Sequence, residues 1–400
     1  MDFIASRMQR IKPSPTSMAT ARVKALQAQG RNVLGLTSGE PDFDTPPHIV
    51  EAAYQAMKAG QTRYTVVDGT AELKRAVADK FKRENGLTYA PDQISVGNGG
   101  KQVIYNALTA TVERGDEVIV PSPYWVSYPD MVLLNGGTPV AVACLPGNGY
   151  KLQPADLEAA ITPRTKWLVL NSPCNPSGAA YTRSELRALG EVLLRHPQVW
   201  VLTDDVYEHL FYDGFEFATM AQAVPELAAR TLTVNGVSKA FAMTGWRIGY
   251  AGGPSELIKA MAKLQSQSTS NPSAVSQAAA LAALTGPMEF LEGWRAEYTK
   301  RRDLVVGKLN AIAGLRCPTP QGAFYVYPDC SGLIGKRTPD GRVIEDDNAL
   351  VLYFLDAQSV GTVQGAAFGL SPAFRISFAT STAELTEGCD RIARACAELT

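Results

Sequence analysis

Short runs of β-forming apolar residues alternate with longer helical stretches between residues 94 and 251. Strands that are apolar almost throughout are typical of a mostly parallel sheet that helices cover on both faces. The pattern therefore predicts an α/β fold in this part of the chain. The strands that it predicts are residues 94–96, 117–120, 167–170, 199–202, 231–234 and 248–251.

Helices are predicted around these strands from their start and stop signals. Residues 47–59 begin with a proline, which the first turn of a helix tolerates, and Gly60 stands where a C-terminal cap belongs. Residues 70–85 are a second predicted helix, closed by Gly86. A further helix over 182–195 opens with a threonine and a glutamate three residues later, which is the pattern of a capping box.

The two ends of the chain are predicted to form a smaller domain. Residues 1–45 are rich in proline and are expected to be an irregular arm and crossing segment, not a packed element. A long helical stretch at 288–312 would link the large domain to the smaller one. We expect an N-terminal arm and start of the small domain over 1–45, a large domain over 46–290, and the rest of the small domain over 291–400.

The C-terminal part combines strands and helices. We predict a strand at 323–327, a helix at 347–357, a strand at 373–378 and a final helix. The final helix begins with Ser381 and Glu384 as its capping box, and its apolar face would be made by residues 385, 389, 392, 396 and 399.

Composition and charge exclude several classes of function. Lysine and arginine number 38 and aspartate and glutamate 39 in 400 residues, so the net charge of −1 gives no electrostatic case for nucleic acid or an acidic membrane. No apolar run approaches the ~18 residues of a membrane span, and the first residues have no apolar signal core. Six scattered cysteines and three histidines fit neither a zinc site nor a disulfide framework. We expect a metal-free, reduced, cytoplasmic protein.

Four loops that follow predicted strands are rich in polar residues and glycine, and open α/β sheets bind ligands at this edge. The first, 96–102, contains Gly99, Gly100 and Lys101, and its backbone amides could hold a phosphate, although a tight strand-to-helix turn explains the glycines at least as well. The second, 171–178, contains Asn175, whose side chain could reach a ligand; a plain rigid turn is the alternative.

The other two loops carry charged side chains. In the third, Asp204, Asp205 and Tyr207 follow an apolar strand, and the carboxylates could face a heteroaromatic cation or only cap the next helix. In the fourth, Lys239 lies among small and aromatic residues and Arg247 follows eight residues later. Desolvation lowers the pKa of a lysine and suits it to imine chemistry, whereas a surface lysine is the usual alternative.

Taken together, the four loops indicate one ligand with a phosphate, a protonated ring nitrogen, a ring hydroxyl and an aldehyde. Pyridoxal 5′-phosphate has all four groups, and proteins bind it through a Schiff-base lysine and an acidic partner of the pyridinium nitrogen.

These motifs resemble those of the class I, fold-type I pyridoxal-phosphate aminotransferases, and in particular the bacterial aspartate/prephenate aminotransferase subgroup. The resemblance covers essentially the whole chain. It implies a large domain with a mostly parallel seven-stranded sheet between helices, a smaller α+β domain, and a homodimer. The motifs that carry it are residues 238–249, which are the most specific, and residues 39–44, 123–128, 175–178 and 374–377.

The resemblance also implies roles for individual residues. Lys239 resembles the lysine that binds the cofactor as an imine and moves the proton between Cα and C4′. Asp204 matches the carboxylate on the pyridinium nitrogen, and Asn175 and Tyr207 match the partners of the ring phenolate oxygen. Further expected cofactor contacts are Gly99, Gly100, Lys101, Ser238 and Arg247 at the phosphate, Trp125 over the ring, and Tyr64 reaching the phosphate of the neighbouring subunit.

The substrate site is implied in the same way. Arg375 resembles the arginine that forks onto the substrate α-carboxylate, a role that lysine cannot copy, and Gly39, Trp125 and Asn175 would line the same site. We find no second arginine for a distal carboxylate, and the subgroup pattern assigns that work to Lys12 and Lys101. The expected reaction moves the amino group between aspartate or glutamate and 2-oxo acids, with prephenate as a further acceptor. A β-lyase, or an aminotransferase for aromatic amino acids or alanine, is the alternative.

Overall fold

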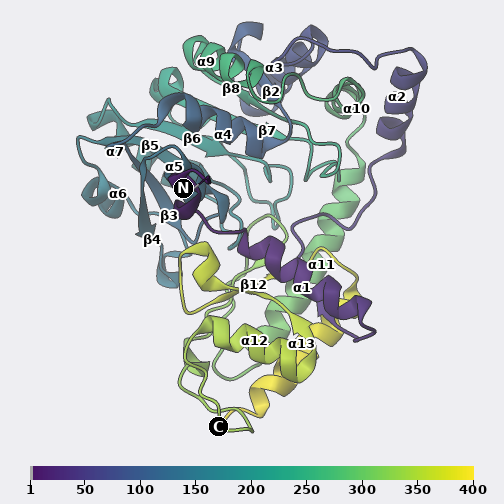
Figure 1. The fold of residues 1–400 in the computed structure, drawn as a ribbon, viewed down its shortest axis with the longest axis vertical. Coiled ribbons are helices and arrows are strands. Elements are labelled where there is room, and N and C mark those ends of the chain that lie inside the picture. The colour runs from purple at the N-terminus through teal and green to yellow at the C-terminus, as the bar shows by residue number, and fades with distance from the viewer. Residues whose placement is uncertain (1–2) are drawn as a thin grey trace.

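The computed structural model describes residues 3–400, which form a large upper lobe and a smaller lower lobe (Figure 1). Over these residues, the sheet of the large lobe has seven strands in the order β2-β8-β7-β6-β5-β3-β4. Only β8 runs antiparallel to its neighbours in the described sheet. The strands are β2 (Ile94–Gly97), β3 (Glu117–Ser122), β4 (Thr138–Ala143), β5 (Thr165–Asn171), β6 (Trp200–Asp204), β7 (Thr231–Gly236) and β8 (Gly249–Gly252). The predicted α/β class is confirmed.

Both faces of this sheet are buried under helices. On β5, Trp167 and Val169 pack into the core below α4, α5 and α9, while Leu168 and Leu170 pack into the opposite core below α6 and α7. This alternation explains why the strands are apolar almost throughout. The helices of this lobe are α2 (Pro47–Lys58), α3 (Ala71–Asn85), α4 (Gly100–Thr111), α5 (Ser127–Leu134), α6 (Pro154–Ala160), α7 (Arg183–Arg195), α8 (Met220–Ala223), α9 (Ser255–Ser266) and α10 (Ala274–Thr285).

The smaller lobe packs two helices against a short antiparallel sheet. α11 (Phe290–Asn310) runs from the large lobe into it (Figure 1). Its sheet has the order β11-β12-β9, and its apolar core includes Phe324, Phe354 and Phe374. The other elements are β9 (Tyr325–Val326), β10 (Val360–Gly361), β11 (Val363–Gln364), β12 (Phe374–Ser377), α12 (Asp347–Gln358) and α13 (Thr382–Ala397).

The predicted helices and strands of both lobes are confirmed to within a few residues. Thr182 and Glu185 form a reciprocal capping box at the start of α7. At the start of α13, the Ser381 hydroxyl accepts a hydrogen bond from the Glu384 backbone amide. The predicted apolar face of that helix is buried. The edge strand β4 was not predicted, because all of its residues are exposed or only half-buried.

The prediction of an irregular arm over residues 1–45 is wrong for α1 (Pro15–Ala28). Pro15 lies in the first turn, where proline does not interrupt a helix, and Val23 is the only buried residue of α1. A single buried position gives no apolar period that sequence reasoning could detect. The segment then forms β1 (Leu34–Gly35), which pairs in parallel with β10 of the smaller lobe.

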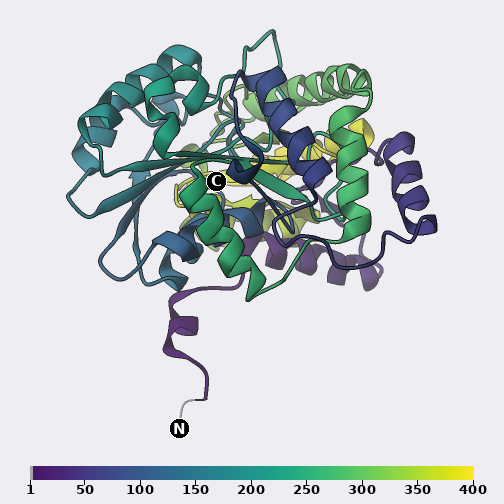
Figure 2. The same cartoon turned by 90° about the horizontal axis from the view of Figure 1, so that it is seen from above.

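Short 3₁₀ helices complete the chain, and the first of them lies in the arm that projects from the body in Figure 2. They are η1 (Ser6–Arg10), η2 (Pro91–Gln93), η3 (Pro146–Asn148), η4 (Pro225–Arg230), η5 (Ser331–Leu333) and η6 (Gly365–Phe368). Within residues 3–400, no helix combines the length and the apolar character that a membrane crossing needs. The six cysteines are buried free thiols.

Candidate active site

A cavity of roughly 1020 Å³ lies where the carboxyl ends of β5, β6 and β7 meet α1 and the smaller lobe. This is the edge at which open α/β sheets bind ligands. It brings together most of the residues that the sequence singled out, from all four loops and from both lobes. The predicted residues that line it are Gly39, Gly100, Lys101, Trp125, Asn175, Asp204, Tyr207, Ser238, Lys239, Arg247 and Arg375.

Lys239 is half-buried in the turn that follows β7. Its ammonium donates a hydrogen bond of 2.6 Å to the Gly39 carbonyl and lies 5.8 Å from the centre of the Tyr207 ring. Burial lowers the pKa of Lys239 to about 8, and the nearby Arg247 and Arg375 act in the same direction against Glu40 and Asp204. A lysine in this state supplies neutral amine near neutral pH, as a nucleophile for carbonyl groups must.

Asp204 is buried at the last position of β6. The Tyr128 hydroxyl donates to its carboxylate at 2.6 Å. Burial raises the pKa of Asp204 to about 6, although the Tyr128 hydrogen bond and Lys239 both favour the charged form. A buried carboxylate with one short hydrogen bond can bind a cationic ring nitrogen, which would repay its desolvation.

The second and third loops are held together by Asn171, at the end of β5. Its amide nitrogen donates to the Asp204 carbonyl at 2.7 Å, and its amide oxygen accepts from the Asn175 backbone at 2.8 Å. Sequence reasoning assigned no role to Asn171 or to Tyr128, although both lie in motifs that it quoted. The signal available was the position of Asn171 at a strand end.

Arg375 is 2% exposed on β12 and pairs with no carboxylate in the described part of the chain. One terminal nitrogen donates to the Asn175 side chain at 2.9 Å and the other to the Thr37 carbonyl at 2.6 Å. Its Nε has no partner among the described residues. A buried guanidinium without a counter-ion is costly, and this geometry offers a place for an anionic ligand.

A second anion site lies at the start of α4. The first amides of a helix have no acceptor within the helix, and the helix dipole favours an anion there. Gly99, at φ +85°, precedes this turn, and a Cβ at Gly99 would lie 2.3 Å from Nη2 of Arg247. Glycine therefore keeps the guanidinium beside the helix start. The Lys101 ammonium lies 4.8 Å from the centre of the Trp125 ring, and burial lowers the pKa of Lys101.

Three predicted residues lie outside the cavity lining of this chain: Gly99, which precedes α4, and also Tyr64 and Lys12. The Tyr64 side chain is 90% exposed. Lys12 is exposed beside Asp130 of α5, and its contact with that carboxylate opposes the rise in the pKa of Asp130 that burial causes. Residues 268–270 contact the first loop, because the Gln102 side chain donates to the Thr269 hydroxyl at 2.5 Å.

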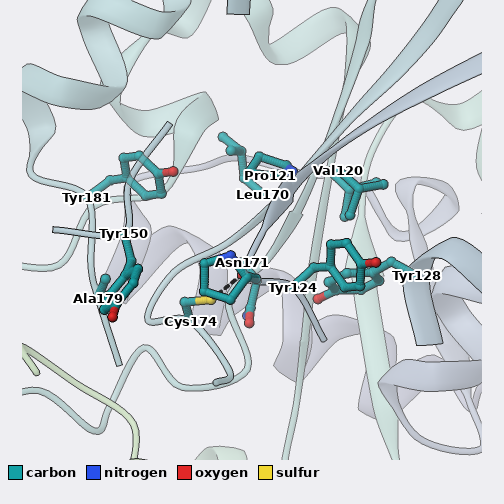
Figure 3. A pocket seen from close by; sticks show the side chains of 12 residues that line it. Val120, Pro121, Tyr124, Tyr128, Tyr150, Leu170, Asn171, Cys174, Ala179 and Tyr181 are labelled. Carbon is teal, nitrogen blue, oxygen red and sulfur yellow. Dashed lines mark hydrogen bonds between the residues drawn. The ribbon is translucent and has the colours of Figure 1, made fainter. Parts of the chain in front are cut away.

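A smaller cavity of roughly 20 Å³ is lined by Asn171 and Tyr128, which also line the larger one (Figure 3). Its wall combines aliphatic side chains and prolines with four tyrosine rings and Cys174, whose thiol donates to the Pro123 carbonyl at 3.5 Å. Its volume is enough for about one water molecule. Only the larger cavity of the two can hold a cofactor and a substrate.

Comparisons with known proteins agree with this geometry. The profile of the family "Aminotransferase class I and II" matches residues 31–392. An aspartate/prephenate aminotransferase of Cereibacter sphaeroides is 60% identical over 399 residues, covering 100% of both chains.

Solved structures give the same result. The aspartate aminotransferase of Rhizobium meliloti is 56% identical with a TM-score of 0.97, covering 99% of each chain. The aspartate aminotransferase of Thermus thermophilus with maleate is 44% identical with a TM-score of 0.92, covering 99% of this chain and 100% of the other. A family match over most of the chain, together with full-length relatives of this identity, places the chain among the class I and II aminotransferases.

Proposed function

We propose that this chain is an aspartate aminotransferase that uses pyridoxal 5′-phosphate to move an amino group between L-aspartate or glutamate and the 2-oxo acids oxaloacetate and 2-oxoglutarate. One observation carries the proposal: a single cavity combines a lysine whose pKa is lowered, a buried carboxylate and a buried arginine without a counter-ion. Full-length relatives that are 56–60% identical bear the names aspartate and aspartate/prephenate aminotransferase.

The residues of the cavity fit pyridoxal phosphate. The cofactor supplies an aldehyde that binds amines and a protonated ring that accepts an electron pair. The start of α4, the glycine at position 99 and the Arg247 guanidinium make a cradle for its phosphate. The proposed contacts are Lys239 for the aldehyde, Asp204 for the ring nitrogen, Asn175 and Tyr207 for the ring oxygen, Trp125 over the ring, and Gly99, Gly100, Lys101, Ser238 and Arg247 for the phosphate.

Three side chains then do the chemical work. Lys239, as a neutral amine, would take the proton from the substrate Cα and return it at C4′ of the cofactor. Asp204 keeps the ring nitrogen protonated. Tyr207 is fixed by a hydrogen bond of 2.9 Å between its hydroxyl and that of Tyr325, so that it can face the ring oxygen without reorientation.

Arg375 is proposed to bind the substrate α-carboxylate. Two of its nitrogens are already fixed by Asn175 and Thr37, and its unpaired Nε leaves hydrogen-bonding capacity for a carboxylate. Gly39 lies at the same end of the cavity: a Cβ at Gly39 would lie 3.3 Å from the Tyr325 hydroxyl, and the Arg375 guanidinium lies 4.6 Å from the centre of the Tyr325 ring.

Substitution Arg375→Lys is expected to lower kcat/KM for every substrate roughly 30-fold, which corresponds to a loss of about 2 kcal/mol of transition-state stabilisation. Lysine keeps the charge but cannot reproduce the planar, fixed donor set. Steady-state kinetics with aspartate, glutamate and a monocarboxylic amino acid would test this. A loss confined to dicarboxylic substrates would mean that Arg375 binds the other end of the substrate.

The distal carboxylate of a dicarboxylic substrate is proposed to meet Lys101 and Lys12. Lys101 already lies in the cavity, and the related Thermus thermophilus structure is described with maleate, a dicarboxylic acid. Prephenate also carries two carboxylates, and the Cereibacter sphaeroides relative is named for it. We therefore propose prephenate as an additional amino acceptor of this chain.

Substitution Lys12→Ala is expected to lower kcat/KM for aspartate, 2-oxoglutarate and prephenate, and to leave any slow reaction with alanine or phenylalanine almost unchanged. An exposed charge interaction is worth up to about 1 kcal/mol, so the expected loss is within about fivefold. The measurement is kcat/KM for both classes of substrate. Equal ratios in wild type and variant would remove Lys12 from the site.

The assembly and the domain division are proposed on related grounds. A tyrosine as exposed as Tyr64, outside the cavity of its own chain, is suited to reach the phosphate site of a second copy in a homodimer. The pairing of β1 with β10 supports a small domain made from 1–45 and 291–400 around a large domain of 46–290. Free buried thiols suit the reducing cytoplasm.

The deciding experiment for the function is a panel of amino donors against oxaloacetate, 2-oxoglutarate and prephenate, with purified protein and added cofactor. Steady turnover that requires a 2-oxo acid is the expected result. Release of ammonia without any acceptor would identify a lyase instead.

A further inference from the structure

A buried cluster of charges lies on the far side of the loop that carries Asp204 and Tyr207. Glu208 follows Tyr207 directly and is 4% exposed, and its carboxylate contacts the ammonium of Lys80, which is 0% exposed on α3. The Asn85 side chain, also on α3, donates to Glu208 at 2.9 Å and accepts from Lys80 at 2.9 Å. The pair is thus hydrogen-bonded on several sides, as a buried ion pair must be if it is to be stable.

The same carboxylate reaches the strand that leads to Lys239. The Asn235 side chain, on β7, donates to Oε1 of Glu208 at 2.7 Å. Asn235 stands four positions before Lys239, and the intervening turn carries Ser238. Glu208 therefore joins three elements: α3, the loop after β6 and the end of β7, of which the last two hold the residues proposed for the cofactor.

A second acid–base pair, Glu84 and His209, belongs to the same cluster. Glu84 lies 3.4 Å from the Lys80 ammonium and 2.9 Å from Nε2 of His209, and together these contacts lower the pKa of Glu84 to about 2 against the effect of burial. The carboxylates of Glu84 and Glu208 and the His209 ring lie within 4.8 Å of one another. Lys80 already supplies the positive charge that this group of ligands could otherwise take from a metal ion.

We infer that Glu208 and Lys80 are positioning residues of the active site: their buried ion pair fixes the Asp204–Tyr207 loop against α3 and the end of β7. Neither Glu208 nor Lys80 lines the large cavity. Their effect reaches the chemistry through the backbone, because Glu208 is adjacent to Tyr207 and the Asp205 amide donates to the Val234 carbonyl at 2.9 Å. This inference rests on the function proposed above.

The test uses Lys80→Met, Glu208→Gln and the double variant, with Glu117→Gln as the matched control. Glu117, like Glu208, is a buried carboxylate in an ion pair, in this case with Arg164. It lies at the end of β3 that is remote from the cavity. Each protein is titrated with pyridoxal phosphate, the visible spectrum of the bound cofactor is followed against pH, and the melting temperature of the cofactor-free protein is measured.

Lys80→Met leaves the buried Glu208 carboxylate without its ammonium, and Glu208→Gln leaves the buried Lys80 with the longer Glu84 contact alone. Each single variant should therefore melt at a lower temperature and bind the cofactor at least about tenfold more weakly. The midpoint of the spectral pH titration should move, and kcat should fall with KM nearly unchanged, because no substrate carboxylate contacts this loop. Glu117→Gln should change the melting temperature alone.

The double variant separates positioning from charge balance. It removes both charges of the pair, so its melting temperature should largely recover. Methionine at position 80 forms no hydrogen bond, so only Asn85 still joins the loop to α3, and cofactor affinity and spectral midpoint should stay altered. The inference is overturned if cofactor affinity and spectral midpoint recover in the double variant together with the melting temperature. It is also overturned if the affinity and midpoint of all three variants equal those of Glu117→Gln, because the ion pair is then only structural. Should the single variants fail to fold, the double variant still decides. Absence of cofactor binding by the wild type would instead refute the proposed function.

Discussion

Replacement of Lys239 by alanine is expected to abolish covalent binding of pyridoxal phosphate and to lower kcat by up to about 10⁴-fold, since the group proposed to move the proton is lost. The physical reason is the state of this amine. With a pKa of about 8, set mainly by burial, the amine is neutral in about one molecule in ten at pH 7. An ordinary lysine would be neutral in about one molecule in three thousand.

The measurement has two parts. Borohydride reduction followed by mass spectrometry should attach the cofactor to wild type and not to Lys239→Ala, and the rate of attachment to cofactor-free wild type should rise between pH 7 and pH 8 as the amine loses its proton. Lys259→Ala is a matched control, because Lys259 is an exposed lysine on α9 in a long contact of 4.0 Å with Asp92. Transamination at the wild-type rate in Lys239→Ala would refute the assignment.

The fold could be predicted from sequence wherever burial was strong and continuous. The central strands are buried on both faces, so β5 and β7 are visible as apolar runs. Two of the elements that were missed, β4 and α1, have weak burial patterns for different reasons. β4 is an edge strand without a fully buried position, and α1 buries Val23 alone. In both cases contacts with other elements determine the structure: β4 pairs with β3, and α1 packs against β10 and β11 of the smaller lobe.

The candidate site divides in the same way. Four loops could be recognised because their polar residues follow buried strands, and the family resemblance added the residues that no local pattern connects. Arg375 contacts Asn175 across 200 positions of sequence, and no spacing within either segment reveals that contact. Tyr128 and the Lys80–Glu208 pair were missed for this reason: each is an ordinary side chain on a helix or loop until the fold brings its partner close.

Substitution Asp204→Asn is expected to lower kcat on the order of 10²–10³-fold, the size found when one electrostatic group at a reacting centre is removed. Asparagine occupies the same volume and can still accept the Tyr128 hydrogen bond, but it carries no charge to keep the ring nitrogen protonated. The carbanion step should suffer most, so the loss should appear in kcat and in the deuterium isotope effect at Cα. KM should change little, because Asp204 does not contact the substrate carboxylates in the proposed arrangement.

The cofactor-free protein provides the control for folding. Burial raises the pKa of Asp204 from 3.8 to about 6, so the folded state holds the proton more tightly than the unfolded state. Stability at this site therefore falls as pH rises from about 4 to about 6 and stays low above that range. Asp204→Asn removes this cost, and the cofactor-free variant should be at least as stable as wild type at pH 7.

Asp205→Asn is the matched variant. Asp205 is also buried, its carboxylate accepts a hydrogen bond from Thr203, and burial raises its pKa, but it does not line the large cavity. Its kcat should stay close to that of wild type. Equal losses of kcat in the two variants, or a loss in KM alone, would contradict the role of Asp204 at the ring nitrogen.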